Sequence, residues 1–428
     1  MVSSIKLLFD TIFSISWQFI CNKFGRPRIN CIENIASDLA RHNIIYSKFF
    51  QSLSSGCEFL NEQEMDFLSK FNDNAPYTED ELYDINELIN ELNNKVSNVE
   101  IVIENDKPIK SGIVAIVYEA VLKDKNSDKK RPIILKVARK NISERLIEAT
   151  DKIRTLVNFI SNFPYLNRLD LPTIFNENVN DILSQVDFER EVNNAIKMRE
   201  NFKNIDYIKI PKVFFEYTSL NKNVIVMEKI VGKRINEVAQ EDKNKYSLMM
   251  AKFSLKCILY DAFYHADLHA GNVFFIKKDG NYKLGIIDFG IMGEITREEQ
   301  NNFYMFFKEA AVEKDSKRAA EVLSTSLIEP RDRFSNLGDE EKNVILDDLA
   351  KVTEETFNSE YNFGIQTIHR INTILEPFSL KLAREFCKIE LSLAISNSVC
   401  MELCDEENTY IDSLNTALND MMSVNVMF

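Results

Sequence analysis

Two short stretches in the second half of the chain decide the fold. The first reads HADLHAGN at His265–Asn272, and the second reads IIDFG at Ile286–Gly290. Asp267 and Asn272 stand five positions apart in the first, and Asp288 follows an apolar run in the second. Carboxylate and amide oxygens are the ligands that Mg²⁺ takes beside phosphate groups, and a carboxylate can also orient a hydroxyl group. The two stretches therefore predict a site for phosphoryl transfer.

The spacing matches the catalytic loop and the DFG sequence of kinases. Asp267 is then the expected catalytic carboxylate, and Asn272 and Asp288 are the expected Mg²⁺ ligands. His265 and His269 are two of the chain's four histidines, so a His–Asp–His transition-metal site is an alternative. No second cluster of His or Cys ligands accompanies them, and this alternative leaves IIDFG unexplained. A chance match of a structural loop is the third interpretation.

A lysine and a glutamate upstream complete the expected nucleotide site. Lys136 lies in the apolar run Ile133–Val137, where a lone cation is costly without phosphate or carboxylate partners. Glu191, within the helical stretch Gln185–Ala195, is the expected carboxylate. Lys136 is therefore predicted to pair with this glutamate and with the phosphates of the nucleotide.

The remaining nucleotide contacts are expected from two backbone segments. Met227 and Glu228 end a strand at the point where the connection between two kinase lobes should fall. Ser111, Gly112 and Ala115 stand where a phosphate-binding loop would lie, but the sequence G-x-G-x-x-G is missing there. An A-P-E sequence is also missing after IIDFG, which argues against the docking of ordinary peptide substrates.

Periodic patterns along the chain predict an α+β, bilobal, protein-kinase-like fold with an N-terminal helical extension. Helical spacing recurs over the first hundred or so residues, with one helix begun by a capping box at Thr78–Glu81, and again over about 142–161 and 178–203. After Ile235 the chain reads as helical apart from one hairpin. The expected parts are residues 1–98 (extension), 99–228 (N-lobe with inserted helices) and 229–428 (helical C-lobe). The expected strands are Val99–Ile103, Ile113–Leu122, Ile133–Val137, Val213–Tyr217 and Asn223–Met227, and the hairpin is Asn272–Ile276 with Lys283–Ile287.

Composition and charge exclude several classes of protein. The chain has 428 residues, with 52 Lys and Arg against 66 Asp and Glu, giving a net charge of −14. With 45% hydrophobic and 28% charged residues, the composition excludes large-scale disorder and collagen-like structure. The net acidic charge argues against nucleic acid as a partner. Seven scattered cysteines without a CxxC pair predict reduced thiols in an intracellular protein that is not secreted. No secretory leader is expected, and no uncharged run reaches the roughly 20 residues of a membrane span.

The first 28 residues are locally basic in this acidic chain. Apolar residues from Ile5 to Ile20 follow helical spacing, and Lys23, Arg26 and Arg28 come directly after them. Two interpretations stay open. We favour a helix that packs on its own domain, and the alternative is peripheral contact with a membrane through residues 1–28.

Several motifs taken together resemble the UbiB/ADCK family of atypical kinases, over about residues 35–300. QVDFEREVNNA at Gln185–Ala195 is similar to the family's E-x-D-F-x-x-E-A-x-N-A helix, and VIVME at Val224–Glu228 is similar to its V-L-V-M-E strand. KFFQSLS at Lys48–Ser54 is similar to its K-x-G-Q-x-x-S sequence, with Phe50 in place of glycine. Pro108–Ala120 takes the place of its alanine-rich loop, although most of the alanines are missing.

The resemblance implies a kinase-like fold whose N-terminal helices cover the active site, with Lys48 and Gln51 directed into it. It also implies ATP or ADP and Mg²⁺ as cofactors and an ATP-dependent kinase or ATPase activity. A lipid or small molecule is favoured over a protein as the acceptor, with a link to lipid or quinone metabolism. The family's functional residues correspond to Lys136, Glu191, Asp267, Asn272 and Asp288.

Two other functions remain open from the residues. HADLHAGN also resembles the H-G-D-L-H-x-G-N loop of aminoglycoside and choline kinases, so a small-molecule phosphotransferase of that type is one alternative. A nucleotide-binding regulatory pseudokinase is the other. The intact set of Asp267, Asn272 and Asp288 favours an active enzyme.

Overall fold

The structure is a computed structural model, and it describes eleven segments of the chain. The chain forms two compact units, Met1–Asn193 with Lys212–Lys229, and Asn194–Pro211 with Ile230–Phe428. Lys48 and Gln51, expected near the nucleotide, lie outside the described residues. The described segments are residues 2–43, 45–47, 61–69, 75, 77–96, 98–127, 129–160, 179, 183–358, 365–404 and 410–423.

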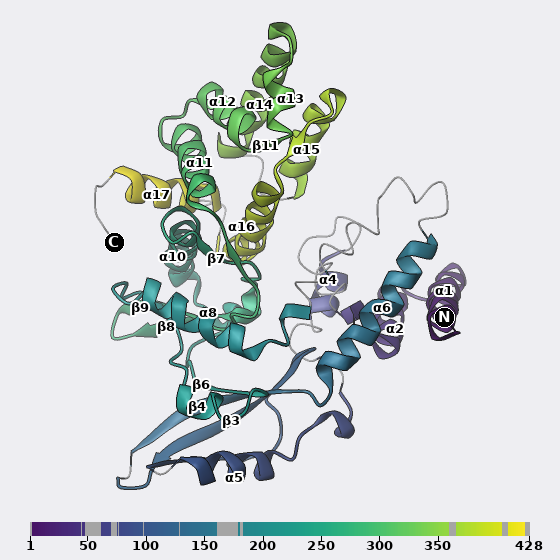
Figure 1. Ribbon diagram of the computed structural model, residues 1–428, viewed down its shortest axis with the longest axis vertical. Coiled ribbons are helices and arrows are strands. Elements are labelled where there is room, and N and C mark those ends of the chain that lie inside the picture. The colour runs from purple at the N-terminus through teal and green to yellow at the C-terminus, as the bar shows by residue number, and fades with distance from the viewer. Residues whose placement is uncertain are drawn as a thin grey trace. The chain divides into compact units, whose positions relative to one another are not determined.

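A five-stranded antiparallel sheet forms the centre of the first unit (Figure 1). The strand order is β1-β3-β4-β6, and β2 pairs with the start of β3. The long β3–β4 hairpin pairs Lys136 with Val117, and β4 pairs in turn with β6. The predicted antiparallel sheet is therefore confirmed. Its strands are β1 (Val99–Val102), β2 (Lys110–Ser111), β3 (Ala115–Asp124), β4 (Lys130–Ala138) and β6 (Val224–Glu228).

One predicted strand, Val213–Tyr217, is wrong. Only Val213 bridges to β6, and the chain then turns into the short helix α9 (Phe215–Thr218). The backbone N–H of Val226, which a longer strand would bind, donates instead to the side-chain hydroxyl of Thr218 at 3.1 Å. The side chain thus replaces a ladder hydrogen bond and lets the backbone coil.

The helix predicted to begin at Thr78 begins later. Glu79–Glu81 forms a single 3₁₀ turn, η2, and α5 runs from Ile85 to Lys95. Asp84 is the cap, because its carboxylate accepts hydrogen bonds from the backbone of the second and third helical residues. The carboxylate of Glu81, expected to close a capping box, instead pairs with two arginines.

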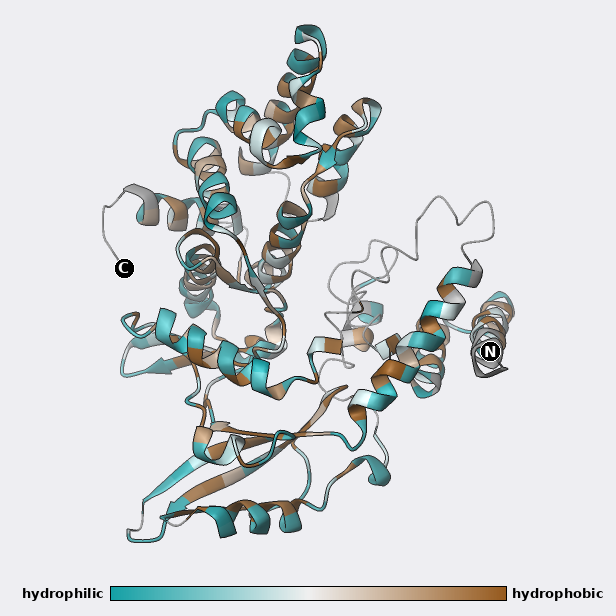
Figure 2. Ribbon diagram, viewed as in Figure 1, coloured by the Kyte–Doolittle hydropathy of each residue, from teal (hydrophilic) through white to brown (hydrophobic). Residues whose placement is uncertain are grey.

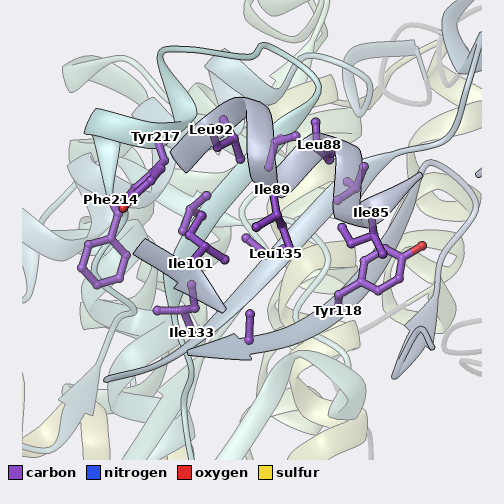
Figure 3. Packing of buried hydrophobic residues seen from close by; sticks show 14 of the residues in the cluster. Ile85, Leu88, Ile89, Leu92, Ile101, Tyr118, Ile133, Leu135, Phe214 and Tyr217 are labelled. Atoms are coloured by element: carbon purple, nitrogen blue, oxygen red, sulfur yellow. The ribbon is translucent and has the colours of Figure 1, made fainter. Parts of the chain in front are cut away.

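Helix α5 covers one face of the sheet (Figure 3). Its apolar side chains, Leu88 and Leu92 among them, point toward Ile133 and Leu135 of β4. In Figure 2 the hydrophobic side of α5 faces the strands and its hydrophilic side faces away. Each side chain fully buried in this way contributes about 1.5–3 kcal/mol.

Two further helices cover the opposite face of the sheet. Leu146 and Ile153 of α6 (Ile142–Ile160) join Phe188 and Val192 of α8 (Phe188–Asn201) in a second core cluster. Because side chains alternate along a strand, Ile133, Leu135 and Val137 face α5, and Lys136 faces the α6 and α8 side. The two-residue alternation of side chains along β4 therefore places Lys136 on the same side of the sheet as α8.

The helices α1 (Val2–Lys23), α2 (Arg28–His42) and α4 (Glu62–Ser69) come before α5 among the described residues. Helix α1 lies beside α2 and α6 (Figure 1). Along the described segments, no helix combines the length and the apolar character needed to cross a membrane.

The second unit is mostly helical, as predicted, and carries small sheets, two of which contain strands that adjoin the stretches HADLHAGN and IIDFG. In one sheet β9 is central, antiparallel to β8 and parallel to β5. The strands are β5 (Ile208–Lys209), β7 (Phe263–His265), β8 (Val273–Lys278), β9 (Asn281–Ile286), β10 (Met292–Glu294), β11 (Ile328–Glu329) and β12 (Lys381–Leu382). The helices, apart from the end of α8, are α10 (Gln240–Leu259), α11 (Arg297–Phe307), α12 (Ser316–Ser326), α13 (Arg331–Ser335), α14 (Asp339–Asn358), α15 (Ile365–Leu375), α16 (Arg384–Glu402) and α17 (Tyr410–Ser423).

Candidate active site

The first unit contains the expected lysine–glutamate pair. Lys136 Nζ donates to both carboxylate oxygens of Glu191, at 2.7 and 2.8 Å. The glutamate side chain is 3% exposed and the lysine side chain is 17% exposed. A buried pair with this geometry holds the ammonium group in a fixed position.

The start of helix α8 explains why Glu191 lies where it does. The carboxylate of Asp187 accepts a hydrogen bond from the backbone N–H of Arg190 at 3.0 Å, which caps the helix. Phe188 and Glu191 are three residues apart and therefore share a helix face. The ring of Phe188 lies 5.8 Å from Lys136 Nζ, so both residues contact the same ammonium group.

In the second unit, a short antiparallel ladder brackets HADLHAGN and IIDFG, the two stretches predicted to be catalytic. β7 leads into HADLHAGN and β10 follows IIDFG, with His265 paired to Met292. Two further backbone bonds join the stretches, from Ala266 N to Ile291 O at 3.1 Å and from Ile287 N to Asn272 O at 2.9 Å. Segments about twenty residues apart in sequence are thereby held next to each other.

Asn272 is oriented by its own loop. Its Nδ2 donates to the backbone oxygen of Asp267 at 3.0 Å, and the side chain is buried. This bond assigns the amide nitrogen to the loop and leaves Oδ1 as the acceptor end of the side chain. An oxygen is the atom that Mg²⁺ requires, so the orientation of Asn272 fits the expected metal.

Asp288 occupies a strained backbone position. Its φ of 64° lies in the left-handed region, which residues other than glycine seldom adopt. One carboxylate oxygen accepts from the N–H of Gly290 at 3.1 Å, which orients the side chain. A carboxylate held in this way suits Mg²⁺ together with the Asn272 oxygen.

His265 serves as a structural link and does not fit the transition-metal alternative. Its Nε2 bonds to the carbonyl oxygen of Asp288 at 2.7 Å, and its Nδ1 accepts from the N–H of Asp267 at 3.2 Å. This pattern requires the neutral ring with the proton on Nε2. Burial lowers the pKa of His265, which agrees with a neutral ring. Within the described segments, no group of three His, Cys, Asp or Glu residues could hold a metal ion.

The residues expected to line the phosphate loop are engaged by their own backbone and neighbours. Ser111 Oγ donates to Ala75 O at 2.8 Å, and the N–H of Gly112 donates to the oxygen of Ala115 at 2.8 Å. Ala115 itself is the first residue of β3 and is buried. The tight turn is stiffer than a glycine-rich loop, and the roles of these residues stay predictions.

Met227 and Glu228, which were expected at the connection between the lobes, are the last two residues of β6. Met227 is buried and pairs with Ile134 of β4. The N–H of Glu228 donates to the carbonyl oxygen of Lys212 at 2.8 Å, and its carboxylate accepts from the N–H of the same residue at 3.2 Å. The first unit ends one residue later. Contact of either residue with a nucleotide stays a prediction.

Sequence reasoning missed Arg139, a buried residue in the first unit. Its guanidinium donates to Glu81 at 2.6 Å, to Ser111 Oγ at 3.0 Å and to Gly112 O at 2.6 Å. The side chain thus joins the end of β4 to the tight turn at Ser111–Ala115. The only signal in the sequence was an arginine directly after an apolar strand.

Two residues that support the catalytic stretches were also missed. Asn194 donates to the carbonyl oxygen of Phe289 at 2.9 Å, and Arg234 donates to that of Gly271 at 2.9 Å. Both bind backbone oxygens from distant positions in the chain, and such contacts have no local sequence pattern.

A family model named "ABC1 atypical kinase-like domain" matches residues 70–323, more than half of the chain. The chain belongs to the ABC1 atypical kinase-like family. The predicted resemblance to UbiB/ADCK kinases is therefore confirmed at the level of the family. The matched range contains both the Lys136–Glu191 pair and the two catalytic stretches.

Curated relatives of this ABC1-family chain are named "Probable protein kinase UbiB". The protein from Aeromonas salmonicida is 30% identical over 304 residues, which cover 67% of this chain and 53% of the relative. The protein from Tolumonas auensis is 25% identical over 358 residues, which cover 81% of this chain and 64% of the relative. The chain thus spans about half to two thirds of the length of these relatives.

A solved structure supports the kinase-like fold of this ABC1-family chain. The Rv3197–erythromycin complex from Mycobacterium tuberculosis aligns with a TM-score of 0.50 at 16% identity, covering 89% of this chain and 91% of that one. At this identity the likeness concerns the fold alone. The predicted α+β kinase-like fold is confirmed.

Proposed function

We propose that this ABC1-family chain binds Mg²⁺ with ATP or ADP and catalyses phosphoryl transfer or ATP hydrolysis. The observation that carries the proposal is the bidentate contact of Lys136 with the buried Glu191. In kinases the lysine of such a pair also contacts the phosphates of the nucleotide, and the proposal gives Lys136 that task.

The proposal assigns one task to each of three further residues. Asn272 Oδ1 and the Asp288 carboxylate would hold Mg²⁺, which neutralises charge that develops on the phosphates. Asp267 would orient the hydroxyl or water that attacks the phosphoryl group. The buried hydrogen bonds of Asn272 and the neutral ring of His265 support these assignments, because they fix side-chain directions before any ligand arrives.

We propose a lipid or small-molecule acceptor in preference to a peptide. The missing A-P-E sequence and the single glycine in the expected phosphate loop both depart from protein kinases that act on peptides. The scattered cysteines and acidic charge favour a reducing, intracellular setting without nucleic acid as a partner. The proposed domain limits are residues 1–98, 99–228 and 229–428.

A thermal-shift titration with Mg²⁺ and ATP, paired with an ADP-release assay, tests the proposal. The wild-type chain is expected to gain thermal stability with ATP only when Mg²⁺ is present, because Asp288 would hold the nucleotide through the metal. Lys136→Met and Asp288→Asn are expected to lose this gain, and Asp267→Asn is expected to keep it while losing ADP release by about 100-fold or more.

Matched controls separate these effects from general damage. Lys123→Met removes a lysine of β3 whose ion pair with Glu100 is exposed, and Asp279→Asn removes an aspartate from the exposed β8–β9 turn. Both should behave as wild type. ATP stabilisation that survives Asp288→Asn would show that the metal assignment is wrong, and stabilisation without any turnover in wild type would favour a pseudokinase.

A further inference from the structure

Helix α1 has the reverse of the polarity expected for a helix on a protein surface. Such a helix normally turns apolar residues to the core and polar residues to water. In α1, Ser14 and Gln18 are buried, at 7% and 6% exposure, whereas Phe9 and Phe13 are exposed, at 74% and 65%. Among the residues whose side chains are described, the large hydrophobic residues exposed from residue 9 to the turn after α1 are Phe9, Ile12, Phe13, Ile15, Trp17, Phe19, Ile20 and Phe24.

Hydrogen bonds fix the rotation of α1 about its axis. The hydroxyl of Thr11 bonds to that of Tyr46 at 2.8 Å, and the hydroxyl of Ser14 donates to Asp38 at 3.3 Å. Gln18 accepts from two further side chains, at 2.8 and 3.4 Å. These three residues follow helical spacing and form one polar stripe. The apolar residues could turn inward only if these hydrogen bonds broke.

The exposed apolar surface is too wide for the narrow stripe that a helix buries in a protein groove. At about 100° per residue, the positions from Ile15 at one edge to Trp17 at the other cover roughly 200° of the helix circumference. A helix lying in the interface of a bilayer buries a broad face of this kind, with aromatic side chains at the level of the headgroups. The width and the aromatic content both favour lipid.

The charge near α1 complements an anionic surface. Residues 1–28 contain four cations, Lys6, Lys23, Arg26 and Arg28, and one acid, Asp10, so their net charge is +3 in a chain of −14. One of these cations, Arg28, pairs with the buried carboxylate of Glu64 at 3.2 Å. Among the exposed residues from 9 to 28 there is no acid. Lys23 Nζ lies 4.9 Å from the centre of the Phe19 ring, so a cation is held directly beside the exposed aromatic surface.

We propose that α1 docks this protein on a bilayer that contains anionic lipids. Its exposed apolar surface enters the interface, and its polar stripe holds the rest of the first unit. The two interpretations left open by the sequence are then both correct, one for each face of the helix. The proposal does not depend on the proposed phosphotransferase activity.

The fluorescence of Trp17 tests this directly, because it is the only tryptophan in the chain. With the full chain, vesicles of phosphatidylcholine and phosphatidylglycerol are expected to shift its emission to the blue. Lipids with brominated acyl chains are expected to quench it. Vesicles of phosphatidylcholine alone should give a smaller effect, and salt should weaken binding to the anionic vesicles.

Variants identify the surface that binds. Phe9→Ser with Phe24→Ser removes two of its most exposed residues and should reduce vesicle partition by about tenfold or more. Phe13 is kept because its ring stacks on Trp17, with centroids 6.4 Å apart. Phe215→Ser is the control, since Phe215 is 57% exposed in α9, and it should bind vesicles as wild type does. Asp288→Asn should also bind normally, which separates docking from catalysis.

Two results would overturn the proposal. One is the absence of both the blue shift and the quenching. The other is a blue shift that grows with protein concentration in the absence of vesicles, accompanied by a dimer mass in light scattering. That second result would assign the exposed surface of α1 to another copy of the chain.

Discussion

At the scale of single residues, Arg139 holds the turn at Ser111–Ala115, where the glycine-rich sequence of a kinase phosphate loop is missing. Its guanidinium is almost fully buried and donates to one carboxylate, one hydroxyl and backbone oxygens. Burial lowers the pKa of Arg139 and the charge of Glu81 raises it, but an arginine keeps its proton in either case. A charge fixed in this way holds the turn at Ser111–Ala115 in one conformation.

Removing this charge should cost much stability. Arg139→Met is expected to lower the free energy of unfolding by about 3–5 kcal/mol, because it leaves Glu81 buried with fewer partners. Urea denaturation followed by circular dichroism measures the change. Arg131→Met, at an exposed position of the same strand, is the control and should change the free energy by less than about 1 kcal/mol. Equal effects at the two positions would contradict the buried role of Arg139.

Glu81 gives a pH-dependent prediction. Burial, the largest single effect, raises its pKa, but Arg145 and Arg139 together outweigh burial and hold the pKa below its ordinary value. A carboxylate with a depressed pKa in the folded state adds stability above its unfolded pKa of about 4.3, and this stability is lost as the pH falls through the folded value. Glu81→Gln should therefore be less stable than wild type near pH 7.

The difference between wild type and Glu81→Gln should shrink as the pH is lowered below about 4, by at most about 1.4 kcal/mol per pH unit. Urea denaturation across a pH series measures it. Glu119→Gln, from an exposed pair with Lys229, should differ little from wild type at any pH. If the difference in free energy of unfolding between wild type and Glu81→Gln stayed constant down to acid pH, this would argue against the pairing of Glu81 with the arginines.

At the scale of elements, the sequence predicted most strands and helices because their periodic patterns are local. The sheet strands at β1, β3, β4 and β6 follow β-branched runs, and α8 follows an apolar stripe. The failures occurred where a side chain competes for the backbone or for a partner. Thr218 takes the hydrogen bond of Val226, and Glu81 turns to arginines that are 58 and 64 positions away.

The sequence also predicted only part of the contacts in the candidate site. The pairing of Lys136 with Glu191 followed from the cost of a lone cation in an apolar strand, and the structure confirms it. The bonds of His265, Asn194 and Arg234 could not be predicted, because backbone oxygens are acceptors at every position and carry no sequence signal. Likewise, helical spacing identified α1 but could not tell which face would be buried.

The β7–β10 ladder that brackets the catalytic stretches depends on one glycine. A Cβ atom at Gly293 would lie 2.2 Å from the ring of Tyr264, its partner in the ladder. Gly293→Ala should lower the free energy of unfolding by about 1–3 kcal/mol, measured by urea denaturation. Gly338→Ala is the control, because its Cβ would meet only a flexible carboxylate at 3.6 Å. If Gly293→Ala left the free energy of unfolding unchanged, the two strands of the ladder could move apart at no cost and the prediction would be wrong.

At the scale of the whole molecule, the chain passes between its two units three times. After Asn193 the chain enters the second unit for Asn194–Pro211, returns to the first unit for Lys212–Lys229, and stays in the second unit from Ile230 onward. That early segment is integral to the second unit. Phe202 packs on Phe253 with ring centroids 4.9 Å apart, and β5 pairs with β9.

A pair of truncations tests this interleaving. The fragment 230–428 lacks the buried side chains of Met198 and Phe202, and it should lose about 5 kcal/mol or more relative to the fragment 194–428. Thermal unfolding followed by circular dichroism should show a cooperative transition for the longer fragment and a broad or absent one for the shorter. Equal cooperativity would mean that residues 194–211 are dispensable for the second unit.

The left-handed backbone at Asp288 limits which substitutions can occur there without damage. Asparagine and glycine tolerate this conformation best, whereas alanine or a β-branched residue would strain it. Asp288→Asn therefore removes the charge while keeping the loop, which makes it the informative variant for metal binding. The same restriction has a historical consequence. A descendant of this sequence that lost the proposed metal binding but kept its fold should carry asparagine or glycine at this position, and a survey of diverged relatives for that substitution would find branches of the family without the proposed activity.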